Sequence, residues 1–200
     1  MTADARAAVF LDRDGVINAN VFYADSGEIE APRRAADFQI VPGAMDAMVR
    51  LQDAGYRLFV VSNQPNQAKR KATRADHDAI QARLLAELNA AGVRIEDFYY
   101  CFHHPDGLEP ALSGPCACRK PSPFFLLQAR DRHGIDLARS WMVGDRASDI
   151  ACGHQAGTRT MLIADGTRPN PSINADDTAP DLAEAVKRIV GGEDALGANR

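Results

Sequence analysis

Apolar runs alternate with amphipathic stretches along most of the chain. Short apolar runs bounded by turn residues predict β-strands at residues 7–11, 56–62, 97–102, 140–144 and 158–164. Apolar residues at helical spacing predict α-helices at residues 42–55, 74–92, 122–134, 147–157 and 179–190. Because strands and helices alternate, we expect βαβ units and therefore an α/β fold, with a parallel sheet covered by helices on both faces.

The length and composition are those of one globular domain. The chain has 200 residues, of which 46% are hydrophobic and 25% are charged, so it can enclose one sizeable core. We expect this domain to span residues 1–190. The segment 165–178 contains several Asp, Asn and Pro residues and predicts a loop, while the end of the chain at 191–200 predicts a frayed, flexible tail.

The charge of the chain gives no reason to expect a nucleic acid or a membrane as partner. The formal net charge is −4, whereas nucleic acids and anionic membrane surfaces attract basic proteins. The apolar run at 7–11 is too short for a signal peptide, and no later run reaches the length of a membrane span. We therefore expect a cytoplasmic protein that acts as a monomer.

Carboxylates follow two of the predicted strands. Asp12 and Asp14 come after the first strand in "VFLDRDGVIN", and Asp145 comes after the fourth in "MVGDRASD". Ligands of open parallel sheets bind at the carboxyl ends of the strands, where the strand order reverses. If these strands are neighbours there, the carboxylates converge and need a cation, and hard oxygen ligands suit Mg²⁺. A single Asp often only caps a helix or ends a strand, so the prediction depends on the combination.

Other polar residues at the same edge are typical of phosphate binding. Ser62 and the backbone of Asn63 follow the second strand, and Arg119 and Lys120 precede a predicted helix in "CRKPSP". Each feature alone is also common in turns and solvated loops. Together with the carboxylates they predict a phosphoryl-transfer site, where catalysis depends on positioning and charge neutralisation.

Cysteines and histidines cluster between residues 101 and 118. Three thiolates and one imidazole would fill the tetrahedral shell of Zn²⁺ and leave no open position for water, which predicts a structural and not a catalytic site. Clustered cysteines favour a metal site over a disulfide framework. The candidate ligands are Cys101, His103, Cys116 and Cys118, although the adjacent His104 is chemically equivalent to His103. Cys152 lies in an apolar context, and we expect it to be buried.

The ordered motifs "FLDRDGVIN", "VVSNQ", "RKP" and "MVGDRASDI" resemble the haloacid dehalogenase superfamily of phosphatases, over about residues 7–165. With "YYCFHHP" and "CACRKP" in addition, the chain is similar to the group of D-glycero-D-manno-heptose 1,7-bisphosphate phosphatases and histidinol-phosphatases. The resemblance implies a Rossmann-like sheet, a minimal cap with a zinc-binding loop, and a Mg²⁺-dependent phosphomonoesterase. It implies release of the 7-phosphate of a small phosphorylated sugar, the heptose bisphosphate, with histidinol phosphate or another sugar or polyol phosphate as alternatives.

The resemblance also implies roles for individual residues. Asp12 would attack phosphorus and form an aspartyl phosphate, and Asp14 would protonate the leaving oxygen and then activate water. The magnesium ligands would be Asp12, the backbone carbonyl of Asp14, and Asp145. Ser62 and Lys120 would stabilise the phosphoryl group, His103 would be the zinc-binding histidine, and Asp149 would support the site without binding the metal. The residues that would contact the substrate are Asn20, Val21, Phe22, Tyr23, Asn63, Arg119 and Arg146.

The sequence departs from the family pattern after "SNQ". The family has a loop of the type S-G-I-A-R-G, whereas this chain has "PNQAKRK", and the proline and the missing glycine change the backbone beside the substrate. The substrate therefore stays open, with a glycerol-type phosphate and a nucleic-acid 3′-phosphate among the alternatives. The insert before residue 42 is too short for a cap domain, so we expect an open site.

Two hypotheses of other classes remain. A receiver-like phosphorylation switch also uses an acidic cluster, a hydroxyl and a lysine, but Asp14 favours rapid discharge of a phosphorylated Asp12. A zinc-stabilised interaction module without catalysis would not need the set of Asp12, Asp14, Ser62, Lys120 and Asp145.

Overall fold

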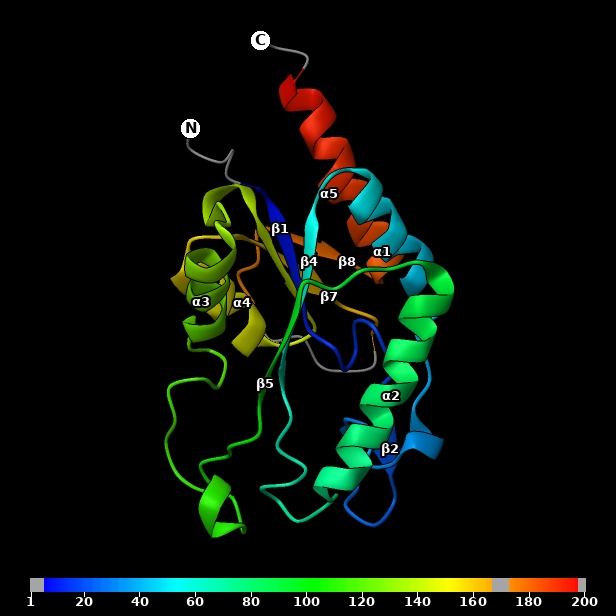
Figure 1. Cartoon of the computed structure of the whole chain (residues 1–200), viewed down its shortest axis with the longest axis vertical. Helices are drawn as coiled ribbons and strands as arrows, with labels where there is room; N and C mark the ends of the chain where they lie inside the picture. The colour runs from blue at the N-terminus through cyan, green and yellow to red at the C-terminus, as the bar shows by residue number, and fades with distance from the viewer. Residues whose placement is uncertain (1–5, 167–172, 198–200) are drawn as a thin grey trace.

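A six-stranded parallel sheet forms the centre of the molecule, with the strand order β5-β4-β1-β6-β7-β8 (Figure 1). The computed structural model describes residues 6–166 and 173–197 of the chain. The strands of this sheet are β1 (Ala8–Leu11), β4 (Arg57–Asn63), β5 (Asp97–Cys101), β6 (Trp141–Gly144), β7 (Arg159–Ile163) and β8 (Asp177–Ala179). All neighbouring pairs are parallel, which confirms the α/β fold class and the strands predicted from the apolar runs.

Helices cover both faces of the sheet (Figure 1). They are α1 (Ala44–Asp53), α2 (Arg74–Ala91), α3 (Phe124–His133), α4 (Ala147–Ala156) and α5 (Leu182–Gly197). The short 3-10 helices are η1 (Ala35–Asp37), η2 (Pro110–Leu112) and η3 (Leu137–Arg139). Helices α1, α2 and α5 pack on one face and α3 and α4 on the other.

Strand β1 is buried on both faces and explains why the sheet must be covered twice. Val9 and Leu11 join the hydrophobic cluster below α1, α2 and α5, whereas Ala8 and Phe10 join the cluster below α3 and α4. Successive side chains of a strand point to opposite faces of the sheet, so a continuous apolar run contributes side chains to the hydrophobic clusters on both faces. The run of apolar residues in the sequence is therefore the signature of a central strand.

The structure corrects the loop predicted at 165–178. Asp177–Ala179 forms β8 at the edge of the sheet, while residues 167–172 lie outside the described part of the chain. The sequence of this strand shows no apolar alternation. Its position is set by pairing with β7 and by a hydrogen bond from the backbone N–H of Thr160 to the carboxylate of Asp176 (2.7 Å). Such long-range pairing leaves no local sequence pattern.

Helix α5 extends into the segment 191–200, for which the flexibility expected from the sequence stays a prediction. Helix α5 continues to Gly197, so residues 191–197 are helical, and residues 198–200 lie outside the described part. The glycines at 191–192 weaken a helix by about 1 kcal/mol each, but the Glu, Asp, Ala and Leu that follow are compatible with a helix and no proline interrupts it.

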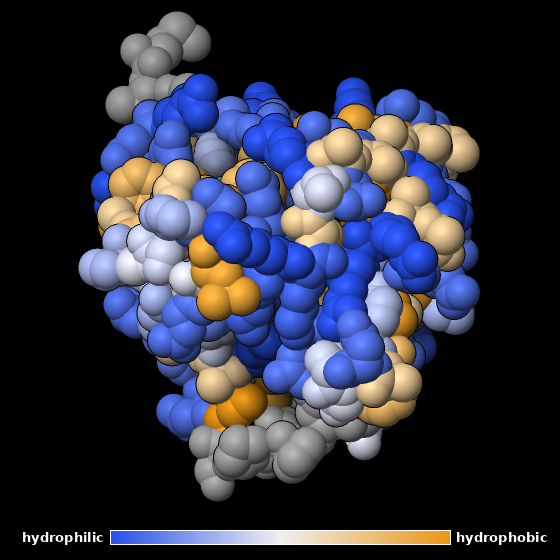
Figure 2. All heavy atoms as spheres, turned by 90° about the horizontal axis from the view of Figure 1, so that it is seen from below, coloured by the Kyte–Doolittle hydropathy of each residue, from blue (hydrophilic) through white to orange (hydrophobic). Residues whose placement is uncertain are grey.

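A hairpin that the sequence did not predict lies at the carboxyl end of the sheet, beside the candidate site. It consists of β2 (Val21–Tyr23) and β3 (Glu28–Glu30), which pair antiparallel. We call residues 21–30 the hairpin and residues 101–118 the zinc loop; both lie at the lower end of the molecule in Figure 1. Figure 2 views this end, and the face is mostly hydrophilic. No helix in the described part of the chain is long and apolar enough to cross a membrane.

Candidate active site

The carboxyl ends of β1 and β6 bring the predicted carboxylates together. Strand β1 pairs with both β4 and β6, so the order of the strands reverses beside it. Carboxylate oxygens of Asp12, Asp145 and Asp149 all lie within 4.8 Å of one another. Gly15 is required at this point, since its φ is +86° and an added Cβ would lie 2.3 Å from Oδ2 of Asp145. The expected convergence of Asp12 and Asp145 is confirmed, whereas the third carboxylate of this cluster is Asp149 and not Asp14.

Lys120 is a buried cation between two of these carboxylates. Its Nζ lies 3.0 Å from Oδ1 of Asp12 and 2.8 Å from Oδ1 of Asp149, and it donates a hydrogen bond to the carbonyl of Val61 (2.6 Å). Burial lowers the pKa of the Lys120 ammonium, but the two carboxylates outweigh this effect and the pKa is raised above its ordinary value. The lysine therefore stays charged beside Asp12.

Asp149 supports this arrangement from the start of α4. Its Oδ2 accepts a hydrogen bond from the backbone N–H of Arg146 (3.0 Å), and its side chain is 1% exposed. Gly144 makes room for it, because an added Cβ there would lie 2.2 Å from the Cβ of Asp149. These contacts agree with the expected supporting position, since Asp149 is already engaged by Lys120 and the helix backbone.

The side chain of Asp14 is held by a cradle of three polar residues. Its carboxylate accepts hydrogen bonds from Nη2 of Arg13 (3.0 Å), Nδ2 of Asn18 (3.0 Å) and Nε2 of Gln64 (2.6 Å). Burial raises the pKa of the Asp14 carboxyl, but the fully buried Arg13 and these hydrogen bonds outweigh it and hold the pKa below its ordinary value. In this conformation the surroundings of Asp14 therefore favour its ionised carboxylate form.

Ser62 and Asn63 end strand β4, as predicted, but they make different contacts. The hydroxyl of Ser62 is buried and accepts a hydrogen bond from Nε2 of Gln64 (3.0 Å). The side chain of Asn63 bonds twice to the backbone of Lys120, donating to its carbonyl (3.1 Å) and accepting from its N–H (3.0 Å). The side chain of Asn63 thus fixes the backbone that carries Lys120. The sequence did not predict this role.

A cavity of about 530 Å³ opens next to Asp12 and Lys120, a volume in the range of small-molecule sites. Of the predicted residues, its lining includes Asp12, Asp14, Asn63, Arg119, Lys120 and Arg146. The lining residues that sequence reasoning missed include Glu28, Ile29, Glu30, Asn66, Lys69 and Ser148. Most of these come from the hairpin and from the loop after β4, which only the tertiary structure brings to the site.

The predicted substrate-contact residues 20–23 belong to the hairpin region, but they are not in the lining of this cavity. Nδ2 of Asn20 donates to Oδ2 of Asp145 (3.1 Å), and the hydroxyl of Tyr23 donates to Asp37 (2.7 Å). Val21 is half-buried, whereas Phe22 is 64% exposed. Contact of these residues with a substrate stays a prediction.

The four predicted zinc ligands form one cluster of free thiols and an imidazole. The Sγ atom of Cys118 lies 3.2 Å from that of Cys101, 3.7 Å from that of Cys116 and 3.8 Å from Nδ1 of His103. A tetrahedral zinc ion with Zn–S bonds of about 2.3 Å separates its ligands by about 3.8 Å, so the donor set fits such an ion. Nδ1 of His104 instead accepts a hydrogen bond from the backbone N–H of Asp106 (3.1 Å).

The zinc loop is tied to the cavity by Arg119, which follows Cys118 directly. Nη1 of Arg119 donates to the carbonyl of His103 (3.0 Å), while the residue itself lines the cavity. Cys152 is buried on α4, as expected, and its thiol donates to the carbonyl of Ser122 (3.2 Å).

Comparisons with known proteins agree with this site. A family model described as HAD-hydrolase-like matches residues 117–185. The D-glycero-beta-D-manno-heptose-1,7-bisphosphate 7-phosphatase of Escherichia coli strain K12 is 37% identical over 187 residues, which cover 90% of this chain and 94% of that protein. The D-glycero-alpha-D-manno-heptose-1,7-bisphosphate 7-phosphatase of Photorhabdus laumondii is 37% identical, covering 83% of this chain and 87% of that protein.

A solved structure shares the fold of this chain. The crystal structure of D,D-heptose 1,7-bisphosphate phosphatase from B. bronchiseptica, complexed with magnesium and phosphate, superposes with a TM-score of 0.74 at 25% identity, covering 93% of this chain and 99% of that chain. The relatives at 37% identity span nearly the whole chain. The chain therefore belongs to the haloacid dehalogenase superfamily of hydrolases, within the family of phosphatases that these relatives represent.

Proposed function

We propose that the chain is a Mg²⁺-dependent phosphomonoesterase that removes the 7-phosphate of D-glycero-D-manno-heptose 1,7-bisphosphate. The observation that carries the chemistry is the buried pairing of Lys120 with Asp12 and Asp149 at the edge of the cavity. It provides a nucleophile beside a fixed positive charge, as phosphoryl transfer requires. The names of the relatives support the choice of substrate.

Asp12 would attack the phosphorus atom of the substrate. Its Oδ1 accepts a hydrogen bond from the N–H of Arg13 (2.8 Å) and pairs with Lys120, which favours Oδ2 as the attacking atom. The bond from Oδ2 to phosphorus forms as the bond from phosphorus to the sugar oxygen breaks, and Asp14 gives its proton to that oxygen. Lys120 balances the charge on the phosphoryl oxygens.

Asp14 would then act as the base that discharges the aspartyl phosphate of Asp12. A water oxygen attacks phosphorus, the bond to Oδ2 of Asp12 breaks, and the proton of the water passes to Asp14. The cradle of Arg13, Asn18 and Gln64 favours the ionised form of Asp14 that this second step needs. For the first step the protonated side chain would leave the cradle and turn toward the leaving oxygen.

Two metal ions fit the donor sets of the chain. Asp12, Asp145 and the backbone carbonyl of Asp14 would hold Mg²⁺, which when bound neutralises charge on the transferring phosphate. Cys101, His103, Cys116 and Cys118 would hold a structural Zn²⁺. The consequence for the chain is that Arg119, bonded to the carbonyl of His103, stays at the cavity.

The cavity favours a small substrate with a second anionic group. Its lining contains Arg119, Arg146 and Lys69 in addition to Lys120, although the whole chain has a net charge of −4. The lining also contains five carboxylates, but the three further cations give a second phosphate of the substrate positively charged partners. The relatives carry the names of both the alpha and the beta anomer, so both anomers belong in the test.

The test is a phosphate-release screen with Mg²⁺ over both anomers of the heptose bisphosphate, the corresponding monophosphates, histidinol phosphate and glycerol phosphates. We expect the highest kcat/KM with a heptose 1,7-bisphosphate, and a loss of at least about 1000-fold in Asp12→Asn. Full turnover by Asp12→Asn would sink the mechanism, and no release from any heptose phosphate would sink the substrate. An acyl phosphate that persists for minutes without turnover would indicate a phosphorylation switch instead.

A further inference from the structure

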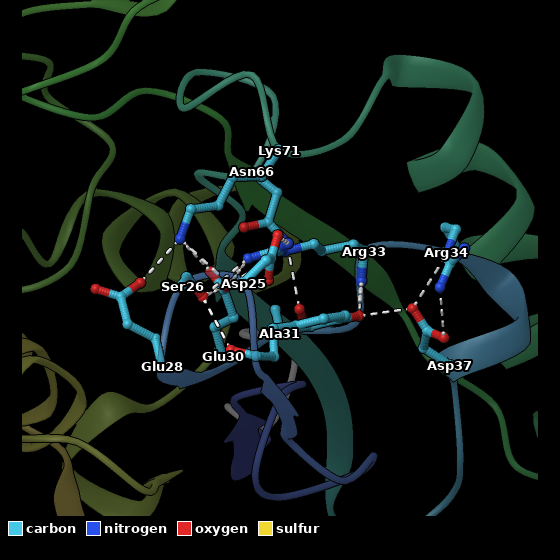
Figure 3. Close-up of polar contacts among 11 residues, drawn as sticks. Asp25, Ser26, Glu28, Glu30, Ala31, Arg33, Arg34, Asp37, Asn66 and Lys71 are labelled. Atoms are coloured by element: carbon cyan, nitrogen blue, oxygen red, sulfur yellow. Dashed lines mark hydrogen bonds and ion pairs between the residues drawn. The ribbon is translucent and has the colours of Figure 1, made fainter.

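The hairpin is fastened to the loop after β4 by Lys71 (Figure 3). The ammonium group of Lys71 lies 2.8 Å from Oε2 of Glu28 and 2.9 Å from Oε2 of Glu30. Close by, Nδ2 of Asn66 donates to the carbonyl of Ala31 (3.3 Å). Lys71 and Asn66 both belong to the stretch "PNQAKRK" and reach across to a segment about 40 residues earlier in the chain. We call these contacts the clasp.

Arg33 completes the charge balance of the hairpin from its other side (Figure 3). Its guanidinium pairs with Glu30, lies 2.6 Å from Oδ2 of Asp25, and donates to Oγ of Ser26 (3.0 Å). It also stacks over the ring of Tyr23, 4.0 Å from the ring centre. Glu30 therefore lies between two cations, one just after the hairpin and one in the loop after β4.

The clasp decides where one wall of the cavity lies. Each strand of the hairpin has only three residues, and a two-stranded hairpin of this size is marginally stable alone. Residues 27–31 nevertheless line the cavity together with Asp12 and Lys120. Lys71 lies outside that lining, so it acts on the cavity through the hairpin.

The clasp also offsets the negative charge of carboxylates that would repel a phosphorylated ligand. Glu28 and Glu30 both line the cavity; without Lys71, Glu28 would lose its cation and Glu30 would keep only Arg33. Burial lowers the pKa of the Lys71 ammonium, but the two carboxylates outweigh it and raise the pKa, so Lys71 keeps its charge.

The clasp residues lie in the stretch that departs from the family pattern S-G-I-A-R-G. Counted from Gln64, Asn66 stands at the first glycine position and makes the bond to Ala31, which a glycine could not make with a side chain. Arg70 stands at the last glycine position and keeps a φ of 53°, the left-handed conformation that favours glycine. Asn66 thus adds a side-chain bond to the segment that follows the hairpin.

We propose that Lys71 is a positioning residue that sets the preference of the enzyme for substrates with a second anionic group. It holds the hairpin at the cavity and offsets part of the negative charge of Glu28 and Glu30. This inference rests on the proposed phosphatase function. It assigns the discrimination between a bisphosphate and a substrate with one phosphate and no second anionic group to a residue outside the cavity.

The kinetic test uses Lys71→Met with two substrates. For a heptose bisphosphate we expect KM to rise about tenfold, while kcat stays within about twofold of that of the natural protein. The reason is that the position of the hairpin and the charge of Glu28 and Glu30 affect substrate binding. For p-nitrophenyl phosphate, whose leaving group has no second charge, we expect kcat/KM within about twofold. Lys187→Met is the matched control, since Lys187 makes a single exposed pair with Glu184 (2.9 Å) on α5, and Lys71→Arg should keep KM within about threefold.

Two further measurements separate the parts of the proposal. Hydrogen exchange of amides in residues 24–31 should be at least about fivefold faster in Lys71→Met, which needs no turnover. Adding Glu28→Gln and Glu30→Gln to Lys71→Met should lower KM again. If no bisphosphate is turned over, the proposed substrate fails while hydrogen exchange still tests the clasp. Unchanged exchange, or an equal rise of KM with both substrates, would overturn the proposal.

Discussion

The zinc loop and the hairpin lie at the same end of the molecule and are held by different forces (Figure 1). The zinc loop gathers four ligand atoms within 4.8 Å of one another, a donor set that fits one metal ion. The hairpin is held by partly exposed ion pairs, in which Lys71 is 22% exposed and Glu28 58%. Metal coordination binds strongly and in one geometry, whereas partly exposed ion pairs are weak and screened by salt.

The two regions also bring different chemistry to the cavity. The zinc loop leads directly into Arg119 and Lys120, two cations that line the cavity. The hairpin brings Glu28 and Glu30, which must be neutralised. The cations are thus on the side that we propose a metal ion holds, and the carboxylates are on the side held by partly exposed ion pairs. Variants of each region can test this division.

The largest effect is expected from Cys118→Ser, which removes one of the four proposed zinc ligands. Loss of the metal should lower the free energy of unfolding by several kcal/mol, on the order of 3, and kcat/KM by about 10 to 100-fold, because Lys120 follows two residues later. Zinc content, thermal unfolding and phosphate release measure this.

The matched control for Cys118→Ser is Cys152→Ala, since Cys152 is buried on α4 and outside the ligand cluster. It should keep the zinc content of the natural protein, with a stability loss of about 1 kcal/mol from the lost packing. A Cys118→Ser protein that has lost its zinc but stays equally stable and fully active would show that the loop is held without the metal.

A smaller effect is expected from Arg33→Met, on the hairpin side. Arg33 is 12% exposed and pairs with Glu30 and Asp25, so its loss should lower the free energy of unfolding by only about 1 kcal/mol and raise KM for the bisphosphate by about threefold. The control is Arg34→Met, because Arg34 is 69% exposed and pairs only weakly with Asp37 (3.4 Å). Equal effects of the two variants on KM would contradict the charge balance of the hairpin.

The contrast between the regions also explains what could be predicted from the sequence. The strands β1, β4 and β6 are apolar runs, and the zinc loop has a ligand spacing that one ion dictates, so local sequence indicates them. The hairpin has the sequence "EIE" in β3, with Ile29 39% exposed, and is positioned by Lys71 from another part of the chain. The local sequence pattern around β3 does not indicate that Lys71 is its partner.

The same reasoning applies inside the site. Asp12, Asp14 and Asp145 follow strands of the sheet and were predictable because parallel strands end at one edge. The hydrogen bond between Asp14 and Gln64 joins residues 50 positions apart. The pairing of Lys120 with Asp149 likewise depends on how α4 packs against β6, which no spacing in the sequence reveals.

The smallest effect concerns His77, which packs against the zinc loop. Its ring lies 4.8 Å from that of Phe102 in the zinc loop, and His77 also borders a small cavity with Asn66 of the loop after β4. Burial, with the nearby Arg13 and Arg74, holds the pKa of the His77 imidazole below its ordinary value.

The pH dependence of His77 follows from this direction. In the unfolded chain a histidine takes up a proton near pH 6.5, whereas His77 in the native protein takes it up only at lower pH. Its stability contribution is therefore complete above about pH 6.5 and decreases as the pH falls from there toward the native pKa. In His77→Gln the free energy of unfolding should fall less steeply between about pH 7 and pH 5.5, by about 1 kcal/mol or less. Urea unfolding at several pH values measures how the free energy of unfolding changes with pH. Equal slopes in the natural protein and in His77→Gln would show that the pKa of His77 does not differ between the folded and unfolded states.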